Sequence, residues 1–111
     1  MSPTDQIEAC VVTTTCPSDE EAARIAKLLL DARLAACIQV ADITSHYVWQ
    51  GKQATEAEKL LLIKTRLALY PQVEAAILSA HSYKVPEVIC LPVRRGSPGY
   101  LGWIGEVTQP G

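Results

Sequence analysis

The stretch "EAEKLLLIKT", residues 56–65, contains an uninterrupted apolar run, Leu60–Ile63, between charged residues. A strand with one face in water alternates apolar and polar side chains, whereas a strand covered on both faces reads as a continuous apolar run. The run therefore predicts a strand in the middle of a sheet, with both faces covered.

The residues before this strand predict its hairpin partner. Residues 34–49, "LAACIQVADITSHYVW", are rich in β-branched and aromatic side chains, and Gln50-Gly51-Lys52 offers a turn. We expect one long strand there, paired with residues 56–65.

Two further segments favour extended structure. Residues 7–16, "IEACVVTTTC", are rich in Val and Thr and end at Pro17. Residues 85–93 contain two prolines, which cannot donate to a strand ladder and so limit where neighbours pair. These segments predict the first and last strands.

Two helices are expected between the strands. Ser18 and Glu21 have the spacing of a capping box, and small or apolar residues then recur every three or four positions as far as Ala36. Pro71 suits the first turn of a second helix, because proline lacks only an N–H that this turn does not use. That helix should end before His81.

The order of these elements defines the fold class. Strand, helix, strand, strand, helix, strand is the α+β, ferredoxin-like βαββαβ sandwich, a four-stranded antiparallel sheet with two helices, and "YLGWI" predicts a short C-terminal helix. Residues 1–111 are long enough for a single domain with its own core. Two helices cover only one face of the sheet, so a second subunit is expected on the other.

Composition argues against several partners. Ten Lys and Arg against twelve Asp and Glu give a net charge of -2, without the basic excess that binds nucleic acid. No run approaches the roughly 20 apolar residues that span a membrane, and the first residues do not resemble a signal peptide. The four cysteines form no C-x-x-C pair. We expect a cytoplasmic protein with reduced, largely buried thiols.

Five motifs in register closely resemble the CutA family of divalent-cation tolerance proteins. They are "LAAC", "YVWQGK", "LLLIKT", "HSYKVPEVICLPV" and "GYLGWI", and they span about Thr13 to Ile104. The resemblance implies a homotrimer without established enzymatic activity, linked to tolerance of copper and other divalent cations and requiring no cofactor. It also implies an architecture similar to the PII proteins, so the alternative is a trimeric ligand-binding or signalling scaffold with clefts between subunits.

The resemblance also implies metal ligands, which this chain has only in part. Metal ligation proposed in the family uses a cysteine near the end of the first strand and two adjacent histidines. Thr14 and Ala80 replace that cysteine and one histidine, which leaves His81, with Cys16 on the same strand face as Thr14. His81 and Cys16 are therefore candidate ligands for copper or another divalent cation. We favour the alternative, in which His81 closes the second helix through the helix dipole.

Four other residues are candidates for a ligand cleft between subunits. Lys64 directly follows the apolar run of this strand, where its ammonium needs a carboxylate, an anion or a route to solvent. With Trp49, Tyr83 and Glu87 it would line such a cleft, or it would belong to a structural polar network. Both alternatives remain open at this point.

Two other classes of function fit the sequence poorly. The ferredoxin-like fold occurs in RNA-binding domains, but those need aromatic-rich strands, and this chain has no phenylalanine. Cys37 and His81 would be the nucleophile and base of an enzyme, but no third group that would orient them is evident. The chain is therefore predicted not to be an enzyme.

Overall fold

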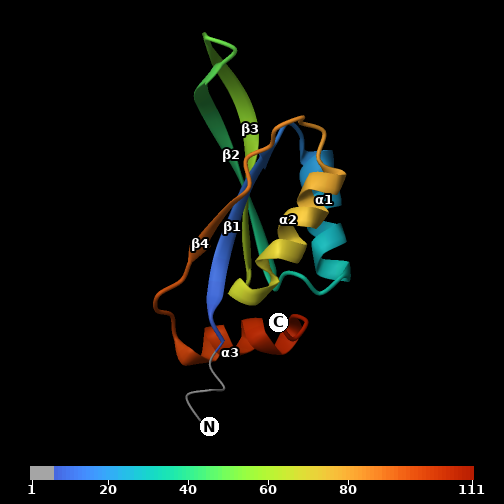
Figure 1. The fold of residues 1–111 in the computed structure, drawn as a ribbon, viewed down its shortest axis with the longest axis vertical. Helices are drawn as coiled ribbons and strands as arrows, with labels where there is room; N and C mark the ends of the chain where they lie inside the picture. The colour runs from blue at the N-terminus through green and yellow to red at the C-terminus, as the bar shows by residue number, and fades with distance from the viewer. Residues whose placement is uncertain (1–6) are drawn as a thin grey trace.

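The computed structural model describes residues 7–111, and the elements of this part of the chain run in the predicted order (Figure 1). They are β1 (Ala9–Cys16), α1 (Asp19–Asp31), β2 (Cys37–Trp49), β3 (Lys52–Arg66), the 3-10 turn η2 (Leu67–Leu69), α2 (Tyr70–Ala80), β4 (Ile89–Pro92) and α3 (Pro98–Val107). The α+β, βαββαβ prediction is confirmed, including the short C-terminal helix. None of the helices in residues 7–111 is both long and apolar enough to cross a membrane.

The strands form one antiparallel sheet in the order β2-β3-β1-β4, which is the ferredoxin-like order. β3 lies between β1 and β2, so its predicted place in the middle of the sheet is confirmed. Figure 1 shows α1 and α2 side by side on one face of the sheet, while α3 lies beneath one end. The helices therefore leave most of the opposite face uncovered.

The core lies between the helices and one face of the sheet. Leu61 and Ile63 of β3 are fully buried there, in one cluster with Ile25 of α1 and Ile77 of α2. Burial of these aliphatic side chains stabilises the fold by roughly 2 kcal/mol each.

The second face of the sheet is apolar and only partly buried. Leu60 and Leu62 alternate with the core residues of β3 and so point to this face. We call it the open sheet face, and register places on it Val11, Leu60, Leu62, Ile89 and Leu91. Ile89 is 48% exposed and Leu91 50% exposed. The apolar run of β3 predicted cover on both faces, but residues 7–111 of one chain cover only one.

α1 begins as predicted and ends earlier. The Ser18 side chain caps it by accepting from the backbone N–H of Glu21 at 3.2 Å. The Glu21 carboxylate accepts instead from the backbone N–H of Ser82, at 2.9 Å. The helix ends at Asp31 rather than near Ala36, because Arg33 has a positive φ of 56° and breaks the helical path.

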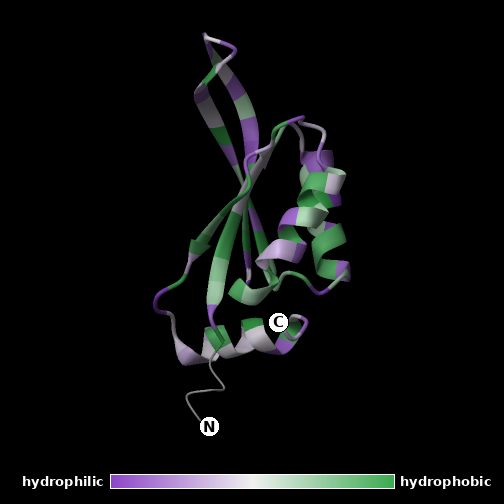
Figure 2. Ribbon diagram, viewed as in Figure 1, coloured by the Kyte–Doolittle hydropathy of each residue, from purple (hydrophilic) through white to green (hydrophobic). Residues whose placement is uncertain are grey.

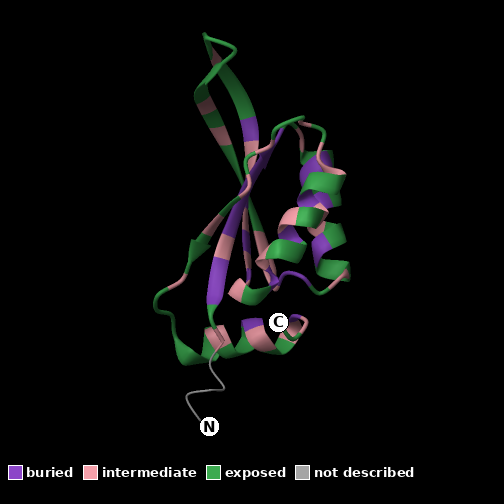
Figure 3. Ribbon diagram, in the orientation of Figure 1, coloured by how far each residue is buried: buried purple, intermediate pink, exposed green. Residues whose placement is uncertain are grey.

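The β2–β3 hairpin extends beyond the helices and is mostly exposed (Figures 1 and 3). Its two-residue turn has positive φ at both positions, 51° at Gln50 and 78° at Gly51. Both angles fit a type I′ turn, whose twist matches that of the flanking strands. Polar and apolar residues both occur along the projecting arm (Figure 2).

The last strand is shorter than predicted. Pairing with β1 extends only from Ile89 to Pro92, whereas the sequence predicted residues 85–93. Residues 81–88 form a loop instead. Pro86 cannot donate a ladder hydrogen bond, and hydrogen bonds hold the His81 side chain against Thr15 and the Tyr83 side chain against Glu58. This loop forms one side of the candidate site.

Candidate functional site

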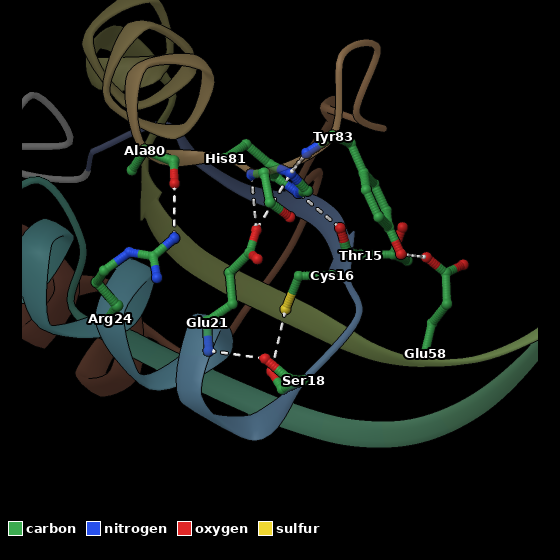
Figure 4. A network of polar contacts seen from close by, with 10 residues as sticks. Thr15, Cys16, Ser18, Glu21, Arg24, Glu58, Ala80, His81 and Tyr83 are labelled. Carbon is green, nitrogen blue, oxygen red and sulfur yellow. Dashed lines mark hydrogen bonds and ion pairs between the residues drawn. The ribbon is translucent and has the colours of Figure 1, made fainter.

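His81 lies directly after α2 in a buried polar network (Figure 4). Its Nε2 donates to the carbonyl oxygen of Thr15 at 2.7 Å, and its Nδ1 accepts from the backbone N–H of Tyr83 at 3.0 Å. The His81 side chain has no exposed surface. This bonding pattern corresponds to a neutral imidazole with its proton on Nε2, and it uses both ring nitrogens.

The Arg24 side chain, not the His81 imidazole, donates a hydrogen bond to a free carbonyl oxygen at the C-terminal end of α2. Its Nη2 donates to the carbonyl oxygen of Ala80 at 2.8 Å (Figure 4). His81 does occupy the C-cap position, but its extended backbone, with ψ 142°, turns the ring toward β1. The prediction that His81 closes the helix is therefore right in position and wrong in the interaction that it named.

Glu21 joins α1 to the loop after α2. Its Oε2 accepts from the backbone N–H of Ser82 at 2.9 Å and lies 3.3 Å from His81 Nδ1. Burial by itself raises the pKa of Glu21, but hydrogen bonds from Ser82, together with nearby His81 and Arg24, outweigh it and leave the pKa below its usual value. Glu21 is thus held as a carboxylate in a nearly buried position.

Cys16 and Thr14 both point into the core and are fully buried. The Cys16 thiol donates weakly to the Ser18 carbonyl oxygen at 3.6 Å, and burial raises its pKa, which disfavours the thiolate that binds metal. The Thr14 hydroxyl has no hydrogen-bond partner among residues 7–111. Thr14 thus leaves a polar group unsatisfied at the position where the resemblance implies a cysteine.

These residues do not fit a tight soft-metal site as they stand. Both nitrogens of His81 are engaged, the Cys16 thiol is held protonated, and within residues 7–111 no group of three or more His, Cys, Asp or Glu is placed to hold a metal ion. A metal bond to His81 would require one of its two hydrogen bonds to break. Metal binding by His81 and Cys16 stays a prediction.

A cavity of about 590 Å³ lies between the β2–β3 hairpin and the loop after α2. We call it the hairpin cleft, and its wall combines three aromatic residues with three carboxylates: Tyr47, Trp49, Tyr83, Glu56, Glu58 and Glu87. The structure thus brings together Trp49, Tyr83 and Glu87, three of the four residues proposed for a ligand cleft.

Lys64 does not join them in this chain. It lies near the end of β3, about six residues or roughly 20 Å along the strand from Glu58. Its Nζ is 5.4 Å from the centroid of the Tyr100 ring on α3. Among residues 7–111 no carboxylate oxygen lies within 4 Å of this ammonium, so it also lacks the acidic partner that a polar network would supply.

Hydroxyl groups, rather than cations, hold the three carboxylates of the hairpin cleft. Tyr83 donates to Glu58 and Thr13 to Glu87, both at 2.7 Å, and Tyr47 donates to Glu56. Burial, and then the bond to Glu58, raise the pKa of the Tyr83 phenol, so it remains a donor at neutral pH. Within residues 7–111 no Lys, Arg or His nitrogen lies within 4 Å of these carboxylates.

Glu56 and Glu58 were missed from the sequence, although a signal for them exists. The two-residue turn pairs Trp49 with Lys52, and this register places Ser45 opposite Glu56 and Ile43 opposite Glu58. Residues an even number apart share a strand face, so both glutamates lie on the face of Trp49. His46 also lines the cleft and contacts Thr55 at 3.1 Å.

The one nucleophile–base pair that the sequence offered is not assembled. Cys37 lies opposite Lys64, whereas His81 bonds Thr15, which lies opposite Leu60. Four residues of β3, roughly 13 Å, separate the two positions. Cys37 and His81 are therefore not placed for proton transfer in this chain.

Comparison with known proteins places these features in a family. The sequence profile of the family "CutA1 divalent ion tolerance protein" matches residues 10–107. The mouse protein "Protein CutA" is 44% identical over 96 residues, which cover 86% of this chain and 54% of the relative. "Divalent-cation tolerance protein CutA" from Thermus thermophilus is 42% identical over 99 residues, 88% of this chain and 96% of the relative. This chain therefore spans about half of the mammalian relative and nearly all of the bacterial one.

Solved structures agree with the fold. "Crystal structure of CutA1 from Oryza sativa" superposes with a TM-score of 0.92 at 38% identity, covering 96% of this chain and 99% of that one. The CutA structure from Archaeoglobus fulgidus gives a TM-score of 0.89 at 37% identity, covering 91% and 99%. The residues that match the family profile, 10–107, include nearly all of β1, all of β3, the loop after α2 and α3. The chain belongs to the CutA1 family of divalent-ion tolerance proteins.

Proposed function

We propose that this chain acts as a non-enzymatic homotrimer that supports divalent-cation tolerance as a ligand-binding module, with the hairpin cleft at the boundary between subunits. The observation that carries the proposal is the position of the cleft, a cavity of about 590 Å³ beside an apolar, uncovered sheet face. Such a cavity, with aromatic walls and a few convergent polar groups, is typical of small-ligand sites.

The open sheet face supports the trimer. Leu60 and Leu62 of β3, and Ile89 and Leu91 of β4 on the other side of β1, leave apolar side chains on this face, and a soluble chain normally covers such a surface with a partner. β2 and β4 are the two edge strands of the sheet, and head-to-tail contacts between different edges form a ring when the rotation between subunits closes. A ring of three is the assembly that the family resemblance implies.

No resident metal cofactor is needed in this proposal. Binding of Cu(II) or another divalent cation by His81 and Cys16 would cost the imidazole a hydrogen bond and require a buried thiol to ionise. We therefore expect direct copper binding at His81 and Cys16 to be weak. The trimer would then support divalent-cation tolerance by binding another ligand or a partner protein.

We place this function in the cytoplasm. The four cysteines are free, and Cys10 and Cys16 are buried among apolar residues. Thiols in this state fit a reducing compartment.

A growth experiment tests the proposal. A bacterial host deprived of its own CutA protein would be grown in graded copper with the wild-type chain, with Leu62→Glu, or with His81→Ala. Leu62→Glu puts a charge on the open sheet face and should abolish the trimer and the rescue, whereas His81→Ala should largely keep both. Rescue by a monomeric Leu62→Glu, or loss of rescue in a trimeric His81→Ala, would contradict the proposal.

A further inference from the structure

Two free cysteines lie next to each other on the neighbouring strands β1 and β4 (Figure 1). The register pairs Cys10 with Pro92 and Val12 with Cys90, so the two cysteines are diagonal neighbours across the ladder. Cys10 is fully buried, and the partly buried Cys90 packs against the same core cluster. Both thiols therefore lie on the helix-covered face of the sheet, away from the open sheet face.

The ladder brings side chains close together at these two positions. The Val93 N–H donates to the Ala9 carbonyl oxygen at 2.9 Å, which marks Ala9 as a hydrogen-bonded position. Such positions alternate along an antiparallel ladder, so Cys10 and Cys90 occupy non-hydrogen-bonded positions, where opposing strands approach more closely. Burial, and then the adjacent Cys90 thiol, raise the pKa of Cys10 from the ordinary value of 9.0 to about 12. The two thiols are thus close enough for one to affect the ionisation of the other.

A metal ion fits this pair less well than a covalent bond does. Within residues 7–111 no third His, Cys, Asp or Glu joins the two cysteines to hold a metal. The raised pKa of Cys10 also disfavours the thiolate that a metal would bind. Two adjacent thiols without further ligands instead favour oxidation to a disulfide.

A disulfide between these positions requires a small movement of β4. Diagonal neighbours in a sheet have Cα atoms roughly 7–8 Å apart, whereas a disulfide usually spans about 4.4–6.8 Å, so a shift of about 1 Å is needed. β4 pairs with β1 only from Ile89 to Pro92, and within residues 7–111 it has no strand on its other side. Short edge segments with few ladder bonds are where local opening costs least.

We propose that Cys10 and Cys90 are a redox-sensitive pair, which a hydroperoxide converts into a disulfide within one chain. The Cys90 sulfur attacks the hydroperoxide, the O–O bond breaks, and Cys90 becomes a sulfenic acid while the alcohol leaves, or water if the oxidant is hydrogen peroxide. The Cys10 sulfur then attacks the Cys90 sulfur, the S–O bond breaks, and water leaves with the Cys10 proton. The two thiols lose two electrons, which reduce one hydroperoxide, and the disulfide fastens β4 to β1.

Burial decides the order of the two steps. Cys10 has no exposed surface, and its pKa of about 12 makes its thiolate roughly a thousandfold scarcer at neutral pH than that of an ordinary thiol. Cys90 therefore meets the oxidant first. The second step joins two groups of one chain, and effective molarities of roughly 10⁵ M for well-placed groups offset the scarcity of the Cys10 thiolate. Neither step depends on the hairpin cleft or on the trimer.

Mass spectrometry of the purified chain after oxidation tests the proposal. The reduced protein would be treated with hydrogen peroxide under native conditions, and the remaining thiols would be alkylated before digestion with trypsin. We expect the mass to fall by two hydrogens, two of the four thiols to remain, and Cys10 and Cys90 to be linked. Fragmentation must separate Cys10 from Cys16, which share one tryptic peptide. Dithiothreitol should restore all four thiols.

Three alanine variants separate the roles of the cysteines. Cys90→Ala should form no link and keep the Cys10 thiol, whereas Cys10→Ala should stop at the Cys90 sulfenic acid, which dimedone traps. Cys16→Ala is the matched control, because Cys16 is also fully buried but lies at the other end of β1, and it should form the link as the wild type does. Circular dichroism of each variant checks that it folds.

The proposed effect on β4 has its own measurement. Exchange of the Val93 amide hydrogen, which bonds to Ala9, should be at least threefold slower in the oxidised chain than in the reduced chain, because the disulfide restricts local opening of β4. Unchanged exchange in the linked protein would refute the fastening of β4.

Several results would overturn the redox pair itself. They are four free thiols after peroxide treatment, oxidised cysteines without a link, a link between two chains, and a link that involves Cys16 or Cys37. Formation of the Cys10–Cys90 link only in denaturant would also contradict it, because the folded sheet would then not bring the two thiols together.

Discussion

Thr14 and Thr65 show how much one hydroxyl group changes the energetics of this core. Both residues are fully buried, but the Thr65 hydroxyl donates to the Leu34 carbonyl oxygen at 2.6 Å, whereas the Thr14 hydroxyl has no partner among residues 7–111. A buried, unsatisfied polar group costs about 1–3 kcal/mol. Thr14, at the position where the resemblance implies a metal-binding cysteine, therefore lowers the free energy of unfolding.

Replacement of each threonine by valine should therefore act in opposite directions. Thr14→Val removes an unsatisfied hydroxyl and should raise the free energy of unfolding by about 1 kcal/mol, whereas Thr65→Val leaves the Leu34 carbonyl unpaired and should lower it by about 1–2 kcal/mol. Denaturant unfolding at equal protein concentration measures both. Equal destabilisation by the two changes would mean that the Thr14 hydroxyl does have a partner.

Glu21 should make stability depend on pH. Its pKa in the folded state lies below the ordinary value of 4.5, so its contribution is present above about pH 4.5 and is lost as the pH falls through the lower folded value. Glu21→Gln keeps an acceptor for Ser82 but loses the charge, and should cost about 1 kcal/mol at pH 7. Thermal melts from pH 7 to pH 3 should show this difference shrinking below about pH 4.5. A difference that is constant over this range would rule out the assigned role of the charge.

The side chains of the site were only partly predictable from the sequence. Trp49, Tyr83 and Glu87 were recognised from motifs and do share the hairpin cleft. The surroundings of His81 were not predictable, because its partner Thr15 is 66 residues away in sequence and local patterns contain no such contact. Lys64 was grouped with the cleft because it belongs to a recurrent family motif, although strand spacing puts it about six residues, or roughly 20 Å, from Glu58.

The β2–β3 hairpin is the element that shapes the cleft, and its turn carries backbone strain. Gln50 has φ 51°, which costs a residue with a Cβ roughly 1 kcal/mol, and Gly51 has φ 78°, which only glycine adopts freely. A Cβ at Gly51 would meet nothing within 4 Å, so its requirement is conformational rather than steric.

Substitutions in this turn should therefore change stability in both directions. Gln50→Asn, which tolerates positive φ, should stabilise by about 0.5 kcal/mol, and Gly51→Ala should destabilise by about 1 kcal/mol. Gly102→Ala is the control, since a Cβ there also meets nothing but lies within helix α3, and it should be neutral or stabilising. The unfolding midpoints of the three variants measure this. Equal destabilisation by Gly51→Ala and Gly102→Ala would argue against strain at the turn.

Elements were predicted well from local patterns and their ends less well. Leu60–Ile63 identified the central strand, and Ser18 and Pro71 marked the helix starts. The early end of α1 depends on the positive φ of Arg33, and the late start of β4 on the packing of the loop after α2. The backbone N–H groups of Arg33 and Leu34 close α1 on the carbonyl oxygens of Leu30 and Leu29, but no glycine marks this turn in the sequence. The loop before β4 depends on tertiary contacts that no local pattern reports.

At the scale of the whole molecule, the central claim is that the open sheet face is an interface between copies of this chain. Leu62 lies in the middle of that face, opposite Thr13 of β1 and Gln39 of β2. Burying a charge there without a partner costs several kcal/mol per subunit, so Leu62→Glu should separate the subunits while leaving the helix-covered core intact.

Light scattering during size-exclusion chromatography, at micromolar concentration, tests this claim most directly. For the wild-type chain the account predicts a mass about three times the 12.0 kDa of one chain. For Leu62→Glu it predicts the mass of one chain with an unchanged far-ultraviolet circular dichroism spectrum. A wild-type mass of 12.0 kDa would contradict the account.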